Sequence, residues 1–167
     1  MSARIRRLTD DDSAAELAIY AEGIATGTAT FETAAPAWES WDASHLAEHR
    51  FVATDEAAAD GDVVLGWVAA SPVSGRCVYA GVIEVSVYVA ASGRGRGLGG
   101  ALVEALVDSS EAAGVWTLEA GVFSDNAPSL ALLDRHGFRR VGVRERLAQR
   151  DGLWRDVVLL ERRSSVV

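Results

Sequence analysis

The chain has 167 residues, 49% hydrophobic and 24% charged, a balance typical of a water-soluble globular domain. Its formal net charge is −8 and it contains no lysine, which disfavours a general nucleic-acid-binding role. The apolar runs are too short to cross a membrane, and the basic N-terminus lacks the apolar stretch of a secretion signal. One cysteine, Cys77, and three scattered histidines predict no metal site. We therefore expect one cytoplasmic domain over residues 1–167.

The N-terminal half predicts a strand, two helices and a hairpin. Asp10–Asp12 offers an N-cap to a helix whose expected apolar face is Leu17, Tyr20, Ala21 and Ile24. Pro36 is expected at the first position of a second helix, which carries Trp38, Trp41 and Leu46. Strands over Arg50–Thr54 and Val63–Ser71 flank a loop over Asp55–Asp62 with a turn signal at Asp60-Gly61.

The C-terminal half alternates strands and helices and closes with a hairpin. The expected strands are Val82–Val89, Trp116–Phe123, Arg139–Leu147 and Leu153–Glu161. A helix that ends near Gly114 presents an apolar face of Leu98, Leu102, Ala105, Leu106 and Ser109. A second helix covers Pro128–His136, and Asp151-Gly152 predicts a two-residue hairpin turn. This order predicts an α/β (α+β) fold with a mixed sheet.

A glycine-rich loop, Gly93–Gly100, lies between the expected strand Val82–Val89 and the following helix. Glycine allows close backbone approach to a ligand, and successive N–H groups at a helix start bind anions. The absence of lysine excludes a GxxxxGK[ST] phosphate loop. Gly95-x-Gly97-x-x-Gly100 matches the dinucleotide pattern, with Glu119 at a suitable distance, but Ala90–Arg94 separate the strand from the first glycine. An oxidoreductase is therefore a minor alternative.

Arg94 to Gly99 also fits the pattern [RQ]-x-x-G-x-[GA] after a strand, and here the sequence resembles the GNAT acetyltransferase superfamily. Asn126-Ala-Pro-Ser129 and Gly137-Phe138 are similar to a second element of that family, N-x-x-[AS]…G-F. The resemblance implies a central mixed sheet of six to seven strands flanked by about four helices. It also implies an acetyl-CoA-dependent N-acetyltransferase that forms a homodimer.

Three further segments are similar to the phosphinothricin and methionine sulfoximine acetyltransferase group: Thr30–Thr33, Arg76–Val89 and Gly152–Val157. The resemblance implies an amino-acid-like acceptor such as phosphinothricin, methionine sulfoximine or methionine sulfone. Two positions depart from the group. Val82 stands where the group has threonine, and Leu133 occupies the position where it has a histidine proton donor and many other members have tyrosine.

The resemblance also assigns the acetyl-CoA contacts. Backbone groups of the splayed strand are expected to bind the pantetheine, with the Val87 N–H facing the thioester oxygen. The expected cofactor-binding residues are Val87, Tyr88, Val89, Arg94, Gly95, Arg96, Gly97, Leu98, Gly99, Gly100, Asn126 and Ser129.

Glu84 is the best candidate for the base that takes the proton of the amine. On a strand Glu84, Ser86 and Tyr88 share one face, and the alternating valines share the other. The alternative is that Glu84 merely pairs with an arginine at the sheet surface. Tyr88 and His136 are candidate substitutes for the proton donor missing at Leu133, although a thiolate leaves tolerably without one.

The expected acceptor contacts are Phe31, Arg76, Tyr79, Glu84 and Ser86. Arg76 suits a substrate carboxylate, but it is equally compatible with a surface arginine, and Phe31 with a core aromatic. Two alternatives stay open for the function: another acceptor amine (a polyamine, an antibiotic or a protein N-terminus), or a non-catalytic acyl-CoA-binding module, motivated by Leu133.

Overall fold

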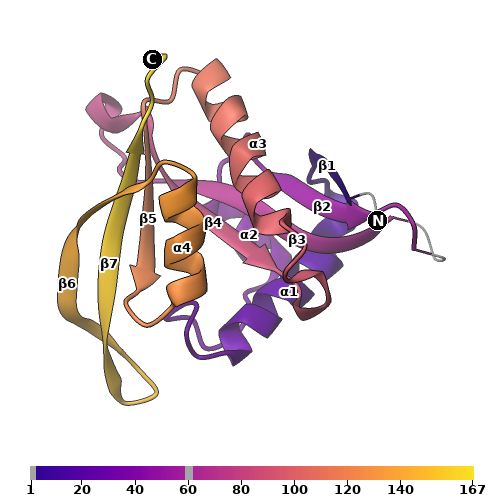
Figure 1. Ribbon diagram of the computed structural model, residues 1–167, viewed down its shortest axis with the longest axis horizontal. Helices are drawn as coiled ribbons and strands as arrows, with labels where there is room; N and C mark the ends of the chain where they lie inside the picture. The colour runs from indigo at the N-terminus through magenta and orange to yellow at the C-terminus, as the bar shows by residue number, and fades with distance from the viewer. Residues whose placement is uncertain (1–2, 59–61) are drawn as a thin grey trace.

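A computed structural model describes residues 3–58 and 62–167 and shows a mixed α/β fold (Figure 1). In these ranges seven strands form one sheet in the order β1-β2-β3-β4-β5-β7-β6. Every neighbouring pair is antiparallel except β4 and β5, which are parallel. The strands are β1 (Ala3–Arg7), β2 (Phe51–Asp55), β3 (Val63–Pro72), β4 (Val82–Val89), β5 (Thr117–Phe123), β6 (Arg139–Arg150) and β7 (Leu153–Arg163). The predicted mixed sheet is confirmed.

Four α-helices in the described ranges cover the two faces of the sheet: α1 (Ser13–Ala25), α2 (Trp38–Ser44), α3 (Leu98–Ala112) and α4 (Ala127–Arg135). Short 3-10 turns cover Asp10–Asp12, Cys77–Tyr79 and Ala91–Gly93. Helices α1 and α2 pack on one face, and α3 and α4 on the other. None of the described helices is long and apolar enough to cross a membrane.

Some details of the predicted elements are confirmed and others are wrong. Asp151 and Gly152 both have positive φ, as the predicted two-residue turn requires. Pro36 is not the first helical residue, because α2 begins at Trp38 after Ala37, and Leu46 lies beyond its end. The predicted Asp60-Gly61 turn lies outside the described residues.

The buried face of α1 also differs from the prediction. Ile24 is buried as expected, but Ala21 is exposed, and the stripe that faces the sheet includes Glu16, Ile19 and Gly23. The pattern of apolar residues alone could not place this stripe, since it contains a carboxylate.

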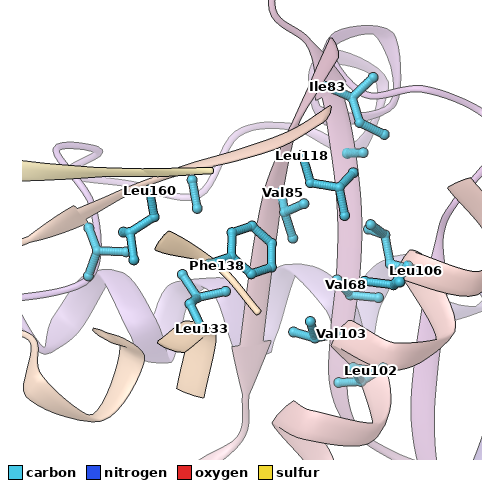
Figure 2. Close-up of a cluster of buried hydrophobic side chains, with 14 of the residues drawn as sticks. Val68, Ile83, Val85, Leu102, Val103, Leu106, Leu118, Leu133, Phe138 and Leu160 are labelled. Carbon is cyan, nitrogen blue, oxygen red and sulfur yellow. The ribbon is translucent and has the colours of Figure 1, made fainter. Parts of the chain in front are cut away.

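The main core lies between the sheet and helices α3 and α4 (Figure 2). Val85 of β4 and Leu118 of β5 pack there with Leu106 of α3 and with Leu133 and Phe138 from the α4 region. Val87 and Val89 pack against the same core, which confirms that the valines of β4 share one face. On the other face Tyr88 joins an aromatic cluster beneath α1 and α2.

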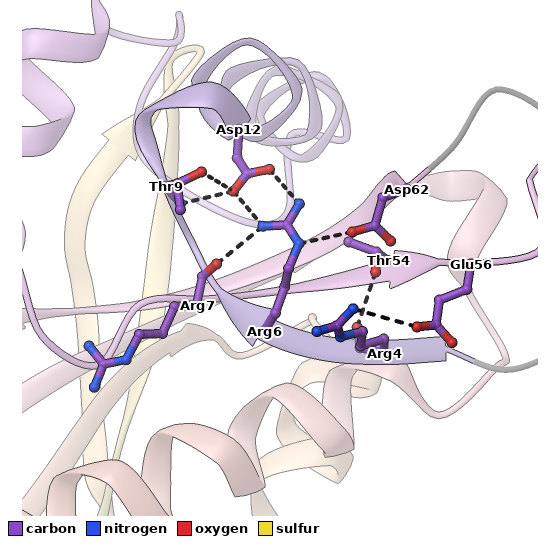
Figure 3. Close-up of polar contacts among 8 residues, drawn as sticks. All are labelled: Arg4, Arg6, Arg7, Thr9, Asp12, Thr54, Glu56 and Asp62. Atoms are coloured by element: carbon purple, nitrogen blue, oxygen red, sulfur yellow. Dashed lines mark hydrogen bonds and ion pairs between the residues drawn. The ribbon is translucent and has the colours of Figure 1, made fainter.

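The start of α1 is held by Arg6 of β1 (Figure 3). Its guanidinium donates two hydrogen bonds of 2.8 Å to the Asp12 carboxylate and one of 3.0 Å to Asp62 at the start of β3. Asp12 also accepts a hydrogen bond from the Thr9 backbone N–H at 2.9 Å. This network joins the edge strand and the turn that begins α1 to the start of β3.

Glu16 is buried in the aromatic cluster without a compensating partner. The residue is 0% exposed, and within residues 3–58 and 62–167 neither carboxylate oxygen has a hydrogen-bond partner. The indole N–H groups of Trp41 and Trp67 are also unpaired. Burial raises the pKa of Glu16 to about 8, against the opposing charge of Arg50.

We therefore expect Glu16→Gln to change the pH dependence of stability. Below the ordinary carboxyl pKa, Glu16 is neutral in both the folded and the unfolded state. As the pH rises towards 8, only the unfolded state ionises, so the wild-type protein loses stability, by up to a few kcal/mol. Urea unfolding at pH 5 and pH 8.5 should show this loss in wild type and in an exposed control, Glu39→Gln, but not in Glu16→Gln. Equal losses in all three proteins would contradict the assignment.

Candidate functional site

Strands β4 and β5 separate shortly after they meet. Their parallel pairing covers Val82↔Thr117, Ile83↔Leu118 and Glu84↔Glu119, and in the described residues it ends there. Beyond this point β4 stays paired with β3 and β5 stays paired with β7. Since alternate residues of a strand direct their N–H and C=O groups to opposite sides, β4 presents free backbone groups to the gap. An extended ligand with amide groups can pair with them as an added strand.

A cavity of about 420 Å³ occupies this gap. Val85–Val89 of β4 form one side and Ala120–Val122 of β5 the other. Its remaining wall comes from Gly23, Thr26, Thr28, Ala29, Arg94, Asp125, Asn126, Pro128, Ser129, Leu132 and Leu133. The site is therefore a slot whose long side is strand backbone.

The loop after α1 is held in the wall of the slot by side chains from distant parts of the chain. Arg150, at the end of β6, is 8% exposed and donates to the carbonyl oxygens of Ile24, Thr30 and Glu32 at 3.0, 2.7 and 2.6 Å. The Asn126 amide N–H donates to the carbonyl of Thr28 at 3.2 Å. The chain pattern alone gave no signal for these contacts, because their partners lie about a hundred residues apart.

Asn126 also begins α4. Its side-chain oxygen accepts the Ser129 backbone N–H at 3.3 Å, the usual geometry of an N-cap. Leu133, one wall residue of α4, is only 2% exposed and packs in the main core as well as against the slot. An apolar side chain thus occupies the position at which the sequence comparison expected a proton donor.

The glycine loop follows Arg94 at the open end of the slot and leads into α3. Gly95 and Gly97 have φ values of +75° and +77°, and a Cβ atom on either would meet nothing within 4 Å. Gly97 is the N-cap of α3 and has no side chain that could cap it, so within the described ranges the first backbone N–H groups of this 15-residue helix are free. The left-handed backbone and the open space suit a phosphate group held by N–H donors.

The predicted loop residues divide into two groups. Arg94 lines the slot and has no ion-pair partner among the described residues, whereas Arg96 forms an ion pair of 3.0 Å with Asp55. A Cβ on Gly99 would press on Leu132, and one on Gly100 on His136, so these two glycines let α3 and α4 approach. Leu98 is buried in the main core, which leaves only its backbone for a ligand.

Glu84 is an exposed residue at the closed end of the slot, where β4 and β5 are paired, and it lies one residue before the cavity begins. Partial desolvation by the surrounding protein raises the pKa of its carboxyl, the charge of Glu119 acts in the same direction, and Arg144 opposes them. Ser86 and Tyr88 follow on the same face, and both line the cavity. The Tyr88 ring stacks on Trp67 at 4.9 Å, and burial raises its pKa, so the phenol stays protonated near neutral pH.

Besides Glu84, three other predicted acceptor residues lie outside the cavity wall. Phe31 packs edge-on against Phe123 of β5 with ring centroids 4.7 Å apart. Arg76 and Tyr79 lie on the turn before β4, with the guanidinium 5.5 Å from the ring centroid. The Nδ1 atom of His136, a candidate proton donor, lies 3.6 Å from the Oε1 atom of Glu104 on α3. Of the predicted site residues, Ser86, Val87, Tyr88, Val89, Arg94, Asn126 and Ser129 line the slot.

Comparison with known proteins identifies the family to which this chain belongs and solved structures with the same fold. Residues 16–138 match the model of the acetyltransferase (GNAT) family. The L-methionine sulfoximine/L-methionine sulfone acetyltransferase of Pseudomonas paraeruginosa is 32% identical over 170 residues, covering 96% of this chain and 94% of the relative. The crystal structure of a phosphinothricin acetyltransferase from Sinorhizobium meliloti in complex with AcCoA has a TM-score of 0.85 and 27% identity, covering 98% and 89%. A ribosomal-protein-alanine N-acetyltransferase structure from Brucella melitensis has the same TM-score and identity, covering 96% and 99%.

The glycine loop gives a direct test of acetyl-CoA binding. Gly97→Val puts a side chain into the open space at the start of α3, and we expect the affinity for acetyl-CoA to fall at least about tenfold. Gly114→Val is the matched control, because Gly114 follows the other end of α3, has a φ of +83° and also has open space around it. Calorimetry on both folded variants measures the affinities. If both variants had the same affinity for acetyl-CoA, any loss relative to wild type would come from backbone strain and not from the glycine loop.

Proposed function

The chain belongs to the GNAT acetyltransferase family and is an acetyl-CoA-dependent N-acetyltransferase. We propose that its acceptor is the primary amine of a small, amino-acid-like molecule. Phosphinothricin, methionine sulfoximine and methionine sulfone are the proposed examples. The observation that carries the proposed function is the slot between β4 and β5, which ends on a glycine loop at the start of α3. The acceptor class is supported by the names of the relatives.

Acetyl-CoA supplies an acetyl group activated as a thioester, and the residues of the slot fit it. We assign the pyrophosphate to Gly95, Gly97, Arg94 and the free N–H groups at the start of α3, since these are the unpaired donors at the open end. The free backbone groups of Val87–Val89 bind the pantetheine amides. The N–H of Val87 faces the thioester oxygen in this arrangement, and a fixed donor of that kind contributes several kcal/mol in other acyl-transfer enzymes.

Glu84 takes the proton of the acceptor ammonium in this proposal. It projects from the same face of β4 as Ser86 and Tyr88, at the end of the slot remote from the glycine loop. Its raised pKa makes it a stronger proton acceptor than an ordinary carboxylate. Leu133 leaves no proton donor at its position, so the thiolate departs either unaided or with a proton from Tyr88, which lines the slot.

A protein N-terminus is the second candidate acceptor, favoured by the likeness to the ribosomal-protein-alanine N-acetyltransferase structure. A free-thiol assay with acetyl-CoA separates the candidates when it compares phosphinothricin, methionine sulfoximine, methionine sulfone, polyamines and N-terminal peptides. Preferred turnover of the amino-acid analogues supports the proposal. Turnover of peptides alone would replace the acceptor class, and no thiol release with any amine would favour a non-catalytic binding module.

We also propose that the protein is a homodimer. The edge strand β6 and the β6–β7 hairpin expose several large apolar side chains in the isolated chain: Val141, Val143, Leu147, Leu153 and Trp154. An exposed edge strand of this kind is usually covered by a neighbour.

Glu84→Gln tests the base. The substitution keeps the shape of the side chain and removes its ability to take a proton, so we expect kcat to fall by about 10²–10⁴. Because the pKa of Glu84 is raised, the acid limb of the wild-type pH profile should lie above the usual range of a glutamate. Higher pH should partly restore the variant, since free amine then forms without the enzyme. Near-wild-type kcat at neutral pH, with unchanged acetyl-CoA affinity, would make Glu84 structural.

Arg76→Ala tests the proposed contact with a substrate carboxylate. Loss of one charge-assisted contact costs roughly 1.5–3 kcal/mol, so KM for the amino-acid acceptor should rise while KM for acetyl-CoA stays nearly constant. Steady-state kinetics measure both constants. Decarboxylated analogues serve as the matched control on the substrate side, and equal wild-type activity on them would refute a carboxylate contact.

A further inference from the structure

Glu84 and Glu119 form the last register pair of the parallel β4–β5 ladder. Register partners on neighbouring strands project from the same face, and the strands lie about 4.8 Å apart. The cavity begins with the next residue on each strand, Val85 on β4 and Ala120 on β5. Two carboxylates therefore stand side by side at the closed end of the slot, where the proposed function places the acceptor amine.

The residues around this pair come from strands β3, β6 and β7 and from the turn before β4. β3 places Ser71 opposite Glu84, and β7 places Glu161 opposite Glu119. Glu161 is neutralised by an ion pair with Arg139 of β6. Within the described part of the chain, neither Glu84 nor Glu119 has an ion pair, and Arg144 of β6 is the cation whose charge reaches Glu84. The turn before β4 carries Arg76, which lies over the Tyr79 ring.

We propose that Glu119 is a positioning residue for proton transfer: its negative charge, one strand away, holds the proton of the incoming ammonium on the Glu84 carboxylate, and Arg144 opposes it. The inference rests on the proposed function, in which Glu84 is the base. The N–H bond of the ammonium breaks and an O–H bond forms on Glu84. The amine then forms the N–C bond to the thioester carbon, the C–S bond breaks, and the second N–H proton passes to the departing thiolate.

The physical reason is that two like charges a few ångströms apart disfavour each other, and a proton on one of them removes the repulsion. At about 5 Å in water the interaction of two unit charges is roughly 0.8 kcal/mol, or about half a pH unit. Glu119 and Arg144 should therefore move the titration of Glu84 in opposite directions.

The test is the acid limb of the pH profile of kcat/KM for the acceptor, which reports the base in the free enzyme. We expect the midpoint to fall by about 0.5 unit or more in Glu119→Gln and to rise by a similar amount in Arg144→Gln. Glu119→Asp should restore most of the wild-type midpoint. Glu161→Gln is the matched control, because this carboxylate lies on the same face, one strand further away, and is already paired with Arg139. The midpoint of the acid limb in Glu161→Gln should stay within about 0.2 pH unit of the wild-type value.

The outcomes distinguish this inference from the proposed function. If Glu84→Gln removes the acid limb but Glu119→Gln and Arg144→Gln leave it in place, the role of Glu119 is refuted and the base survives. If Glu84→Gln has no effect on the limb, the proposed base itself is wrong. Should Glu119→Gln fail to bind acetyl-CoA normally, Glu119→Ser, which also removes the charge, decides in its place. An unmoved limb in that variant would overturn the inference.

Discussion

The separation of β4 from β5 is the constraint on which the rest of this structure depends. The two strands are joined at one end, where the backbone N–H groups of Trp116 and Thr117 both donate to the carbonyl of Gly81, at 2.9 and 3.1 Å. Any side chain at Gly81 would collide with the Trp116 indole. Further along, β4 is paired with β3 and β5 with β7, the two halves of the sheet diverge, and the slot between them has strand backbone along its length.

This slot keeps its binding groups in place before any ligand arrives. The free groups of β4 are held by its ladder with β3, and the N–H groups at the start of α3 are fixed by the helix. Donors that are already oriented need no reorganisation during the reaction, which is why such sites stabilise developing charge well. The loop after α1 is fixed in the same way, through the buried Arg150.

Charge is distributed along the slot as the chemistry requires. The glycine-loop end carries Arg94 and free N–H donors, which suit the phosphates of the donor molecule. The closed end carries Glu84 and Glu119, which suit a cationic amine and its proton. The net charge of −8 conceals this polarity, because the sum over a whole chain says nothing about where its charges meet.

The sequence by itself determined what depends on neighbours in the chain. The alternation of Val85, Val87 and Val89, the Asp151-Gly152 turn and the glycine loop before α3 follow from local backbone preferences, and family resemblance turned that loop into an acetyl-CoA expectation. The same local reasoning placed Pro36 wrongly in a helix and took Ala21 for a buried residue.

Only the tertiary structure decided which distant residues meet. Arg96 forms an ion pair with Asp55, and Gly99 and Gly100 allow α3 to pack closely on α4. Glu119 is the register partner of Glu84 on the neighbouring strand. These relations depend on the register of neighbouring strands and on how closely helices approach. Both are set by the packing of the whole core, a property to which residues far apart in the chain contribute together, and no local pattern in the sequence carries it.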